Sequence, residues 1–273
     1  MLDFLSERFA AIPATRWRER MESGEVCDER GRPIAPECAY RSGVKLYYYR
    51  SLPYERVIPF EDQLLFRDEH LVVADKPHFL PVTPGGRYVE QTLLTRLKHR
   101  LRLDRLQPLH RLDRDTAGIV LFGVQPLERD AYHALFRQRH VHKLYHAIAP
   151  IATGLRFPLT RESRLAHGAH YFQQTEVPGP ANAVTQIDLL QTSGSRGLYA
   201  LQPLTGQRHQ LRVHMAALGL PIEGDVLYPQ VLRGPDEPDD WSQPMQLLAK
   251  SISFADPFTG LVRQFESRRQ LRL

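Results

Sequence analysis

The chain has 273 residues, enough for one large domain or two unequal ones, and its 42% hydrophobic and 25% charged residues are ordinary for a soluble protein. No apolar run approaches the roughly 18–20 residues that cross a bilayer, and the N-terminus lacks the residue order of a signal peptide, so we expect a cytoplasmic protein without membrane attachment. The net charge of +5 is too modest to imply an acidic partner, and its distribution along the chain is more informative.

The first part of the chain, residues 1–53, is predicted to form a small α+β module. Two short helical patterns are followed by a hairpin over residues 25–34 and a strand over residues 42–50. A linker with two prolines follows at residues 51–62. A unit of this size is marginal alone, so we expect it to dock or to bind something.

The larger part, residues 54–273, mixes strands and helices irregularly. The predicted strands cover 70–77, 119–124, 143–151, 184–191 and 197–204. One predicted helix has Leu93, Leu97 and Leu101 on a single face, and two more cover 127–140 and 205–219. The acidic, proline-rich residues 233–244 are expected to be a solvated loop. This order favours an α+β fold with a mixed, largely antiparallel sheet flanked by helices over a regular doubly wound sheet.

Positive charge is concentrated in residues 95–114, which hold seven Arg or Lys and two Asp, a local net charge of +5. Such a field suggests a polyanionic partner such as nucleic acid. Arg96, Lys98 and Arg100 lie on the predicted helix of this segment and are candidates to contact phosphates. A merely solvated helix face remains the alternative interpretation.

Several common kinds of site are excluded by spacing. The histidines do not form a His-Glu-x-x-His pair, and two cysteines cannot build a four-thiolate site, so we expect no metal. No Gly-x-Ser-x-Gly elbow, P-loop or Gly-x-Gly-x-x-Gly turn is present, so we expect no nucleotide cofactor. Cys27 and Cys38 are expected to be reduced.

The remaining candidates are an acid, an aromatic residue and two arginines. Asp113 lies between two arginines, whose charges favour the ionised carboxylate. Tyr145 lies on a predicted strand, and Arg208 and Arg212 are one turn apart on a predicted helix. Each alone is more often structural: a salt bridge, a core residue or a surface cation.

Together these segments carry a resemblance. The stretches "HRLDRDTAGIVLF", "DKPHFLPVTP", "KLYHA", "LTGQRHQLRVHMAALGLPIEGDVLYP" and "LLAKSISFADPFTG" occur in that order over roughly residues 60–260. They resemble the motifs of the RluA-type pseudouridine synthases, among them His-Arg-Leu-Asp-x-x-Thr-Ser-Gly and Thr-Gly-Arg-x-His-Gln-Ile-Arg. Ala117, Gln207, Leu220 and Leu248 depart from the family pattern, which has Ser, Arg, His and His there.

The resemblance implies isomerisation of uridine to pseudouridine in ribosomal or transfer RNA, without cofactor or metal. It implies that Asp113 is the catalytic carboxylate, that Arg212 is its ion-pair partner, and that Tyr145 packs on the uracil. It also implies that Arg111 fills the gap left by the flipped base. Whether Asp113 attacks the base, attacks the sugar or acts as a base stays open.

The N-terminal residues resemble a small RNA-binding module of the ribosomal-protein type. With Arg16, Arg18, Arg20, Arg30 and Arg32, residues 1–53 are expected to bind RNA away from the reaction site or else to pack on the catalytic part. We expect a monomer whose partner is RNA, with Arg208 among the RNA contacts. The alternatives are a non-catalytic RNA-binding protein and, less favoured because no recognition helix stands out, a DNA-binding regulator.

Overall fold

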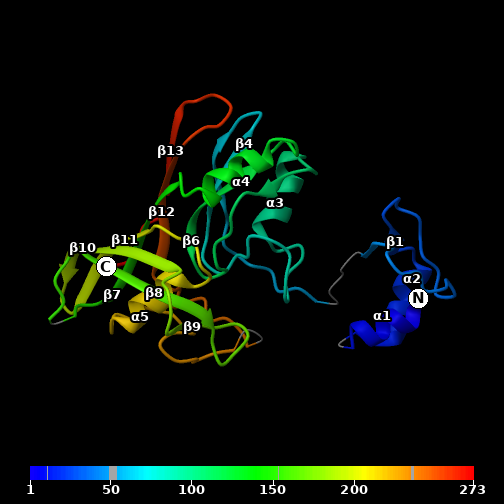
Figure 1. The fold of residues 1–273 in the computed structure, drawn as a ribbon, viewed down its shortest axis with the longest axis horizontal. Coiled ribbons are helices and arrows are strands. Elements are labelled where there is room, and N and C mark those ends of the chain that lie inside the picture. Colours follow the sequence, from blue (N-terminus) through cyan, green and yellow to red (C-terminus); the bar gives the residue numbers. More distant parts are fainter. Residues whose placement is uncertain (11, 49–53, 153, 235–236) are drawn as a thin grey trace. The chain divides into compact units, whose positions relative to one another are not determined.

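The computed structural model describes residues 1–273 except 11, 49–53, 153 and 235–236. The chain divides into two compact units, residues 1–53 and 54–273 (Figure 1). Part of the predicted strand at 42–50 and part of the predicted linker fall outside the described residues.

The N-terminal unit has two helices and two short antiparallel strands. Its elements are α1 (Leu2–Arg8), α2 (Ala14–Glu22), β1 (Val26–Asp28) and β2 (Leu46–Tyr48). Its apolar core is built from Leu2, Leu5, Trp17, Met21 and Val26. The predicted hairpin over 25–34 forms: the chain turns at residues 28–31, the Asp28 N–H donates to the Arg32 carbonyl, and the Ile34 N–H donates to the Val26 carbonyl. The strand partner of β1 on its other side is β2. The turn there is held by Asp28, whose carboxylate accepts backbone N–H groups from Arg30 and Arg32.

Several of this unit's arginines have partners inside the unit. Arg16 pairs with Glu19 at 2.9 Å and Arg32 with Asp28 at 2.7 Å. Arg20 is buried with its guanidinium over the rings of Trp17 and Tyr48. The unit's nine Lys and Arg against eight Asp and Glu leave a net charge of only +1.

The larger unit is built on one twisted mixed sheet. Its strand order is β3-β4-β6-β12-β7-β11-β10-β8-β9, with β13 beside β12 and β5 beside β6. Among the strand pairs within the described residues only β6 and β12 run parallel. The strands are β3 (Gln63–Arg67), β4 (Leu71–Lys76), β5 (Gln107–Pro108), β6 (Ala117–Gly123), β7 (His142–Pro150), β8 (Leu159–His167), β9 (Gln174–Val177), β10 (Ala183–Ser193), β11 (Arg196–Pro203), β12 (Leu247–Ala255) and β13 (Val262–Glu266).

One half of this sheet is covered on both faces by helices: β4 and β6 are buried at every position, and successive side chains point to opposite faces. Val72, Ala74, Val120 and Phe122 pack with the leucines of α3 (Leu93–Leu101). On the other face, Leu71, Val73, Ile119 and Leu121 pack with Tyr132 of α4 (Arg129–Arg137). Figure 1 shows α3 and α4 beside β4 and β6.

The other half is covered by α5 (Gln210–Ala217), which packs Leu211 and Met215 on Ala147, Tyr199 and Leu201 of β7 and β11. The helix begins later than the predicted range 205–219. The side chain of Gln210 accepts hydrogen bonds from the Thr205 hydroxyl and the Gln207 N–H, and so holds the preceding residues in an irregular loop.

The fold is therefore α+β with a largely antiparallel mixed sheet, as predicted, plus the small N-terminal α+β unit. The expectation of a solvated loop at 233–244 is wrong for its second half. The side chain of Asp239 is 4% exposed, and Trp241 lies under the Arg56 guanidinium at 3.7 Å. No helix in the described part of the chain is both long enough and apolar enough to span a membrane.

Candidate active site

A cleft of about 1350 Å³ opens in the larger unit, between the half covered by α3 and α4 and the half covered by α5. It is lined by the loop before β6, the start of β7, the loop before α5 and residues around 239–245. Asp113, Arg111, Tyr145, Arg208 and Arg212 all line this cleft. The candidates for catalysis and uridine binding, from three separate motifs, are thus brought together.

Asp113 lies in the loop between β5 and β6, and a buried lysine fixes this loop. The Nζ of Lys76 donates to the carbonyl of Arg114 at 2.9 Å, and to the carbonyls of Pro77 and Leu80 at 3.1 and 2.8 Å. Lys76 is fully buried, and burial lowers its pKa to about 7 although Asp115 and Asp113 oppose that change. Three carbonyl acceptors satisfy the three hydrogens of its ammonium group, so the lysine ties β4 to the residue next to Asp113.

Arg212 is the nearest arginine to Asp113, but its main partner is another acid. Its Nε and Nη2 donate to the two carboxylate oxygens of Asp225 at 2.7 and 2.6 Å. Its Nη1 lies 3.3 Å from Oδ2 of Asp113. The fork to Asp225, which is buried along with the guanidinium, fixes the direction in which the third nitrogen faces the cleft.

The Asp113 carboxyl is held in its ionised form. Burial acts to raise its pKa, but the charges of His209 and Arg212 and the hydrogen bond from Arg212 outweigh it, so the pKa lies below its ordinary value. The side chain keeps 30% of its surface exposed, on the cleft side. The residue therefore offers a charged carboxylate to anything that enters.

His209 and Tyr228 form a buried pair behind Asp113. The Tyr228 hydroxyl accepts the N–H of Gln174 at 2.8 Å and lies 2.8 Å from Nδ1 of His209. Since a phenol has one hydrogen, we assign it to the bond with Nδ1, which leaves the imidazole hydrogen on Nε2. That Nε2 lies 3.7 Å from Oδ2 of Asp113, so the ring faces the carboxylate; burial lowers the pKa of His209, and the charge of Asp113 opposes that change.

Tyr145 lies on β7 and keeps its phenol protonated. Burial raises its pKa and the charge of Asp113 raises it further; both residues line the cleft. Arg111, two residues before Asp113, is exposed at the cleft. An aromatic side chain and a flat guanidinium therefore stand near the same carboxylate.

The other predicted RNA contacts have different surroundings. Arg96 donates to the carbonyls of Phe60 and Ile58 and to Gln91, and Arg100 pairs with Asp62 at 2.5 Å. These bonds give both arginines of α3 intramolecular acceptors, and RNA contact by them or by Lys98 stays a prediction.

Arg208 has intramolecular acceptors as well. It reaches the cleft wall, where its guanidinium donates to the carbonyls of Tyr171 and Phe172, both at 3.2 Å. RNA contact by Arg208 likewise stays a prediction.

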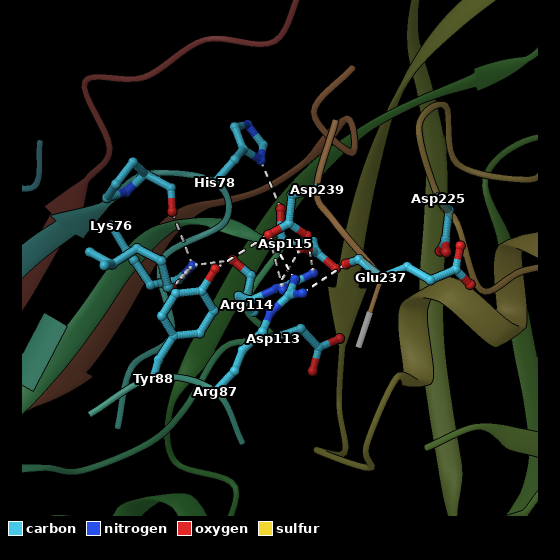
Figure 2. A network of polar contacts seen from close by, with 12 residues as sticks. Lys76, His78, Arg87, Tyr88, Asp113, Arg114, Asp115, Asp225, Glu237 and Asp239 are labelled. Carbon is cyan, nitrogen blue, oxygen red and sulfur yellow. Dashed lines mark hydrogen bonds and ion pairs between the residues drawn. The ribbon is translucent and has the colours of Figure 1, made fainter. Parts of the chain in front are cut away.

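A network of charges surrounds Arg114, the residue after Asp113 (Figure 2). Its Nη2 lies 2.8 Å from Asp239, and its Nε lies 3.1 Å from Asp115. Arg87 binds the same Asp239 carboxylate at 2.9 Å. The backbone oxygen of Asp115 accepts a hydrogen bond from His78. The loop with Asp113 is thus held by side chains from two other segments, with Asp239 from one and His78 from the other.

Sequence reasoning missed Lys76, His209, Asp225, Tyr228 and Asp239 as members of this site. The first four lie within the segments that resemble the family motifs, so the sequence indicated the segments but not the contacts that these residues make. Asp239 lies in a segment that only looked acidic and proline-rich, and nothing in its sequence indicated burial.

The sequence is similar to those of known proteins. Residues 70–217 match the family model described as RNA pseudouridylate synthase. An uncharacterised RNA pseudouridine synthase of Synechocystis is 34% identical over 236 residues, which cover 84% of this chain and 79% of that protein. Human pseudouridylate synthase RPUSD2 and the yeast mitochondrial tRNA pseudouridine(32) synthase are each 32% identical, and the matches span 32% and 37% of their lengths.

The fold has a match among solved structures. Human RNA Pseudouridylate Synthase Domain Containing 1 is 21% identical, with a TM-score of 0.62, over 77% of this chain and 84% of that chain. The larger unit therefore has the fold of the pseudouridine synthases, and the residues that match the family model include Asp113, Tyr145 and Arg212. The chain belongs to the RNA pseudouridylate synthase family, whose members are isomerases acting on RNA.

Proposed function

We propose that this protein converts specific uridines of structured ribosomal or transfer RNA to pseudouridine, with Asp113 as the reacting carboxylate. The observation that carries the proposal is the ionised Asp113 at the cleft, 3.3 Å from an arginine that Asp225 orients. The name of the yeast relative supports a transfer RNA among the candidates.

The chemistry needs what this cleft offers. Uridine and pseudouridine are isomers, so the glycosidic bond to nitrogen breaks, the uracil turns, a bond to carbon 5 forms, and the hydrogen of carbon 5 is replaced. The sum of these steps is neither an oxidation nor a reduction. An anionic carboxylate can serve as nucleophile or base in this sequence. Asp113 is kept in that anionic form by its neighbours.

Tyr145 and Arg111 suit the handling of a flipped base. A base inside an RNA stack must leave it at a cost of a few kcal/mol to reach an enzyme pocket. Tyr145 offers a flat wall beside Asp113, on which a detached uracil can turn without escaping. Arg111, exposed at the rim, can stack its guanidinium in the space that the base vacates.

The experiment follows tritium release from RNA that carries tritium at carbon 5 of uridine, because that hydrogen leaves only when the new bond forms. Total RNA from a strain that lacks the gene serves as substrate, and sequencing maps the modified uridines. Asp113→Asn should abolish release while RNA binding and the melting temperature stay near those of the parent. Release by this variant within about tenfold of the parent would contradict the role of Asp113, and no release by the parent chain would favour a protein that only binds RNA.

A further inference from the structure

The cations that line the cleft differ in whether a carboxylate of the same chain neutralises their charge. Arg87 and Arg114 share the carboxylate of Asp239, as Figure 2 shows. Arg212 is bound to Asp225. The positive charges on this part of the cleft wall are therefore matched by carboxylates of the same chain, which reduces their attraction for a phosphate.

A second group of cations lacks such matching. We call Arg137, Arg139 and Lys143 the basic corner; they come from the end of α4, the turn after it and the start of β7, and all three line the cleft with Asp113. Among the described residues no carboxylate lies within ion-pair distance of Arg139. Arg137 pairs with Asp130, but both side chains are mostly exposed, at 59% and 86%. Such a pair contributes little and exchanges readily with another anion.

Two members of the basic corner, Arg139 and Lys143, carry like charges that oppose each other. Burial lowers the pKa of Lys143, and the charge of Arg139 lowers it further. The Lys143 ammonium donates to the carbonyl of Thr205 at 3.1 Å, which fixes the head group without neutralising it. Clustered like charges destabilise a fold slightly, and an anion that binds among them relieves the repulsion.

Another segment at the cleft carries negative charge. Residues 237–244 contribute Glu237, Asp239 and Asp240, and the last two line the cleft. Asp239 binds two arginines, and Asp240 accepts hydrogen bonds from Ser242 and lies near the charge of Arg233. These carboxylates make residues 237–244 less attractive to a phosphate chain than the basic corner.

We propose that the basic corner binds the phosphates of the RNA strand that flanks the flipped uridine. The backbone of that strand passes over the end of α4 and the start of β7, on the same side as Arg111, and not over α3. This inference rests on the proposed function, because it takes RNA as the ligand of the cleft. It assigns phosphate binding to residues outside the segment 95–114 that carries the highest charge.

The test measures binding of a fluorescently labelled oligouridylate of 20 nucleotides to the full chain over a range of salt concentrations. The variant is Arg137→Gln with Arg139→Gln. The matched control is Arg102→Gln with Arg105→Gln, two exposed arginines that follow α3 and do not line the cleft. Both variants remove two positive charges and keep the N-terminal unit, so any binding by that unit is common to both.

Each phosphate contact on a single strand contributes about 0.7 to the slope of log affinity against log salt. The basic-corner variant should therefore lose about 1.4 from that slope and bind roughly tenfold more weakly near physiological salt. The control should stay close to the parent, since exposed charges farther than about 8 Å from the strand are screened. Equal slopes in the two variants, or a loss confined to the control, would overturn the proposal.

Binding of oligouridylate requires no turnover, so this result does not depend on catalysis. Tritium release by the parent chain reports separately on the proposed function. If the chain binds through the basic corner but releases no tritium, isomerisation is refuted and the proposed phosphate-binding surface is still supported. A chain that releases tritium with unchanged salt dependence in the variant would refute the surface alone.

Discussion

Arg212 is bound more closely to Asp225 than to Asp113: the fork to Asp225 measures 2.7 and 2.6 Å, and the contact to Asp113 measures 3.3 Å. One guanidinium thus serves a buried structural acid and a cleft-facing acid at the same time. Asp225 orients the arginine, and the arginine in turn helps to keep Asp113 ionised.

The first prediction concerns Arg212→Met. The pKa of Asp113 lies below its ordinary value partly because of Arg212, so removal of the guanidinium should raise that pKa. Activity requires the anion and is lost as the pH falls through the pKa, so the acid limb of the pH–rate profile should move to higher pH. An acid limb that stays in place would show that Arg212 does not set the charge of Asp113.

The same variant should also lose stability, because it leaves the buried Asp225 without its partner. Breaking a buried ion pair on one side costs about 3–5 kcal/mol. The double variant Arg212→Met, Asp225→Asn removes the uncompensated charge and should recover part of that loss in a denaturant titration. The shift of the acid limb should persist in the double variant, which separates catalysis from stability.

The second prediction concerns Tyr228→Phe, which removes the hydroxyl between Gln174 and His209. Without the donor to Nδ1, the imidazole is free to move its hydrogen there and to turn a lone pair toward Asp113. We expect turnover to fall about tenfold, with a smaller effect on KM. The control is Tyr199→Phe, which removes a buried hydroxyl that donates to the carbonyl of Pro150. Similar turnover in both variants would argue against a role for His209.

How much of this site was predictable depends on the separation of its partners. Asp113, Tyr145 and Arg212 each lie in a contiguous motif, so the residue types and their order along the chain predicted that the three residues belong to one site. The contacts that position them join distant segments: Arg212 reaches Asp225 across 13 positions, and Arg114 reaches Asp239 across 125. No local pattern specifies such a pair, because either acid alone looks like a surface residue.

Two of the departures from the family pattern are explained by the register of the sheet. Ala117 and Leu248 are direct partners in the parallel pair of β6 and β12, and both are buried. The family pattern has a serine and a histidine there, so two polar residues are replaced together by two apolar ones. A single replacement would leave one buried polar group without a partner, at a cost of about 1–3 kcal/mol. The parallel pairing could not be read from the sequence, and so neither could this compensation.

The third prediction concerns Asp239→Asn. The amide keeps the shape but leaves Arg87 and Arg114 without the carboxylate between them. Since Arg114 adjoins Asp113, we expect turnover to fall about tenfold, with a smaller change in KM. Asp239→Glu restores the charge and should recover part of the activity. The control Asp240→Asn removes a carboxylate that bonds only to Ser242, and it should leave turnover unchanged. Equal turnover in both asparagine variants would assign Asp239 to stability alone.

The fourth prediction concerns Gly118→Ala, where β6 meets β12. The backbone there has a φ of +112°, and an added Cβ would lie 2.2 Å from the Ala249 carbonyl oxygen. Because backbone atoms must move to make room, we expect a loss of more than about 3 kcal/mol in a denaturant titration. Gly260→Ala has a φ of +70° with no atom within 4 Å, so it should cost only about 1 kcal/mol. Comparable losses would mean that conformation alone, and not the contact with β12, requires glycine.

The last prediction concerns residues 1–53, which either bind RNA or pack on the larger unit, and the two hypotheses predict different effects of removing them. The unit has a net charge of only +1, and Arg16, Arg20 and Arg32 already have partners within it. RNA binding through these arginines alone is therefore expected to be weaker than the sequence suggested. The unit does present exposed aromatic rings, which stack on unpaired bases regardless of sequence. They are Phe4, Phe9, Tyr40, Tyr47 and Tyr48.

A unit that tethers RNA raises the effective concentration of substrate without touching the step that breaks the bond. Deletion of residues 1–53 should then raise KM for long RNA, leave turnover at saturation nearly unchanged, and hardly affect a stem-loop too short to reach both units. Tyr40→Ala with Tyr47→Ala in the full chain should reproduce part of the KM effect, since each stacked base contributes about 1–3 kcal/mol. If the unit instead completes the fold of the larger one, the truncated chain should melt earlier and lose activity on long and short substrates alike. Equal losses on both substrates, together with a lower melting temperature, would overturn the tether.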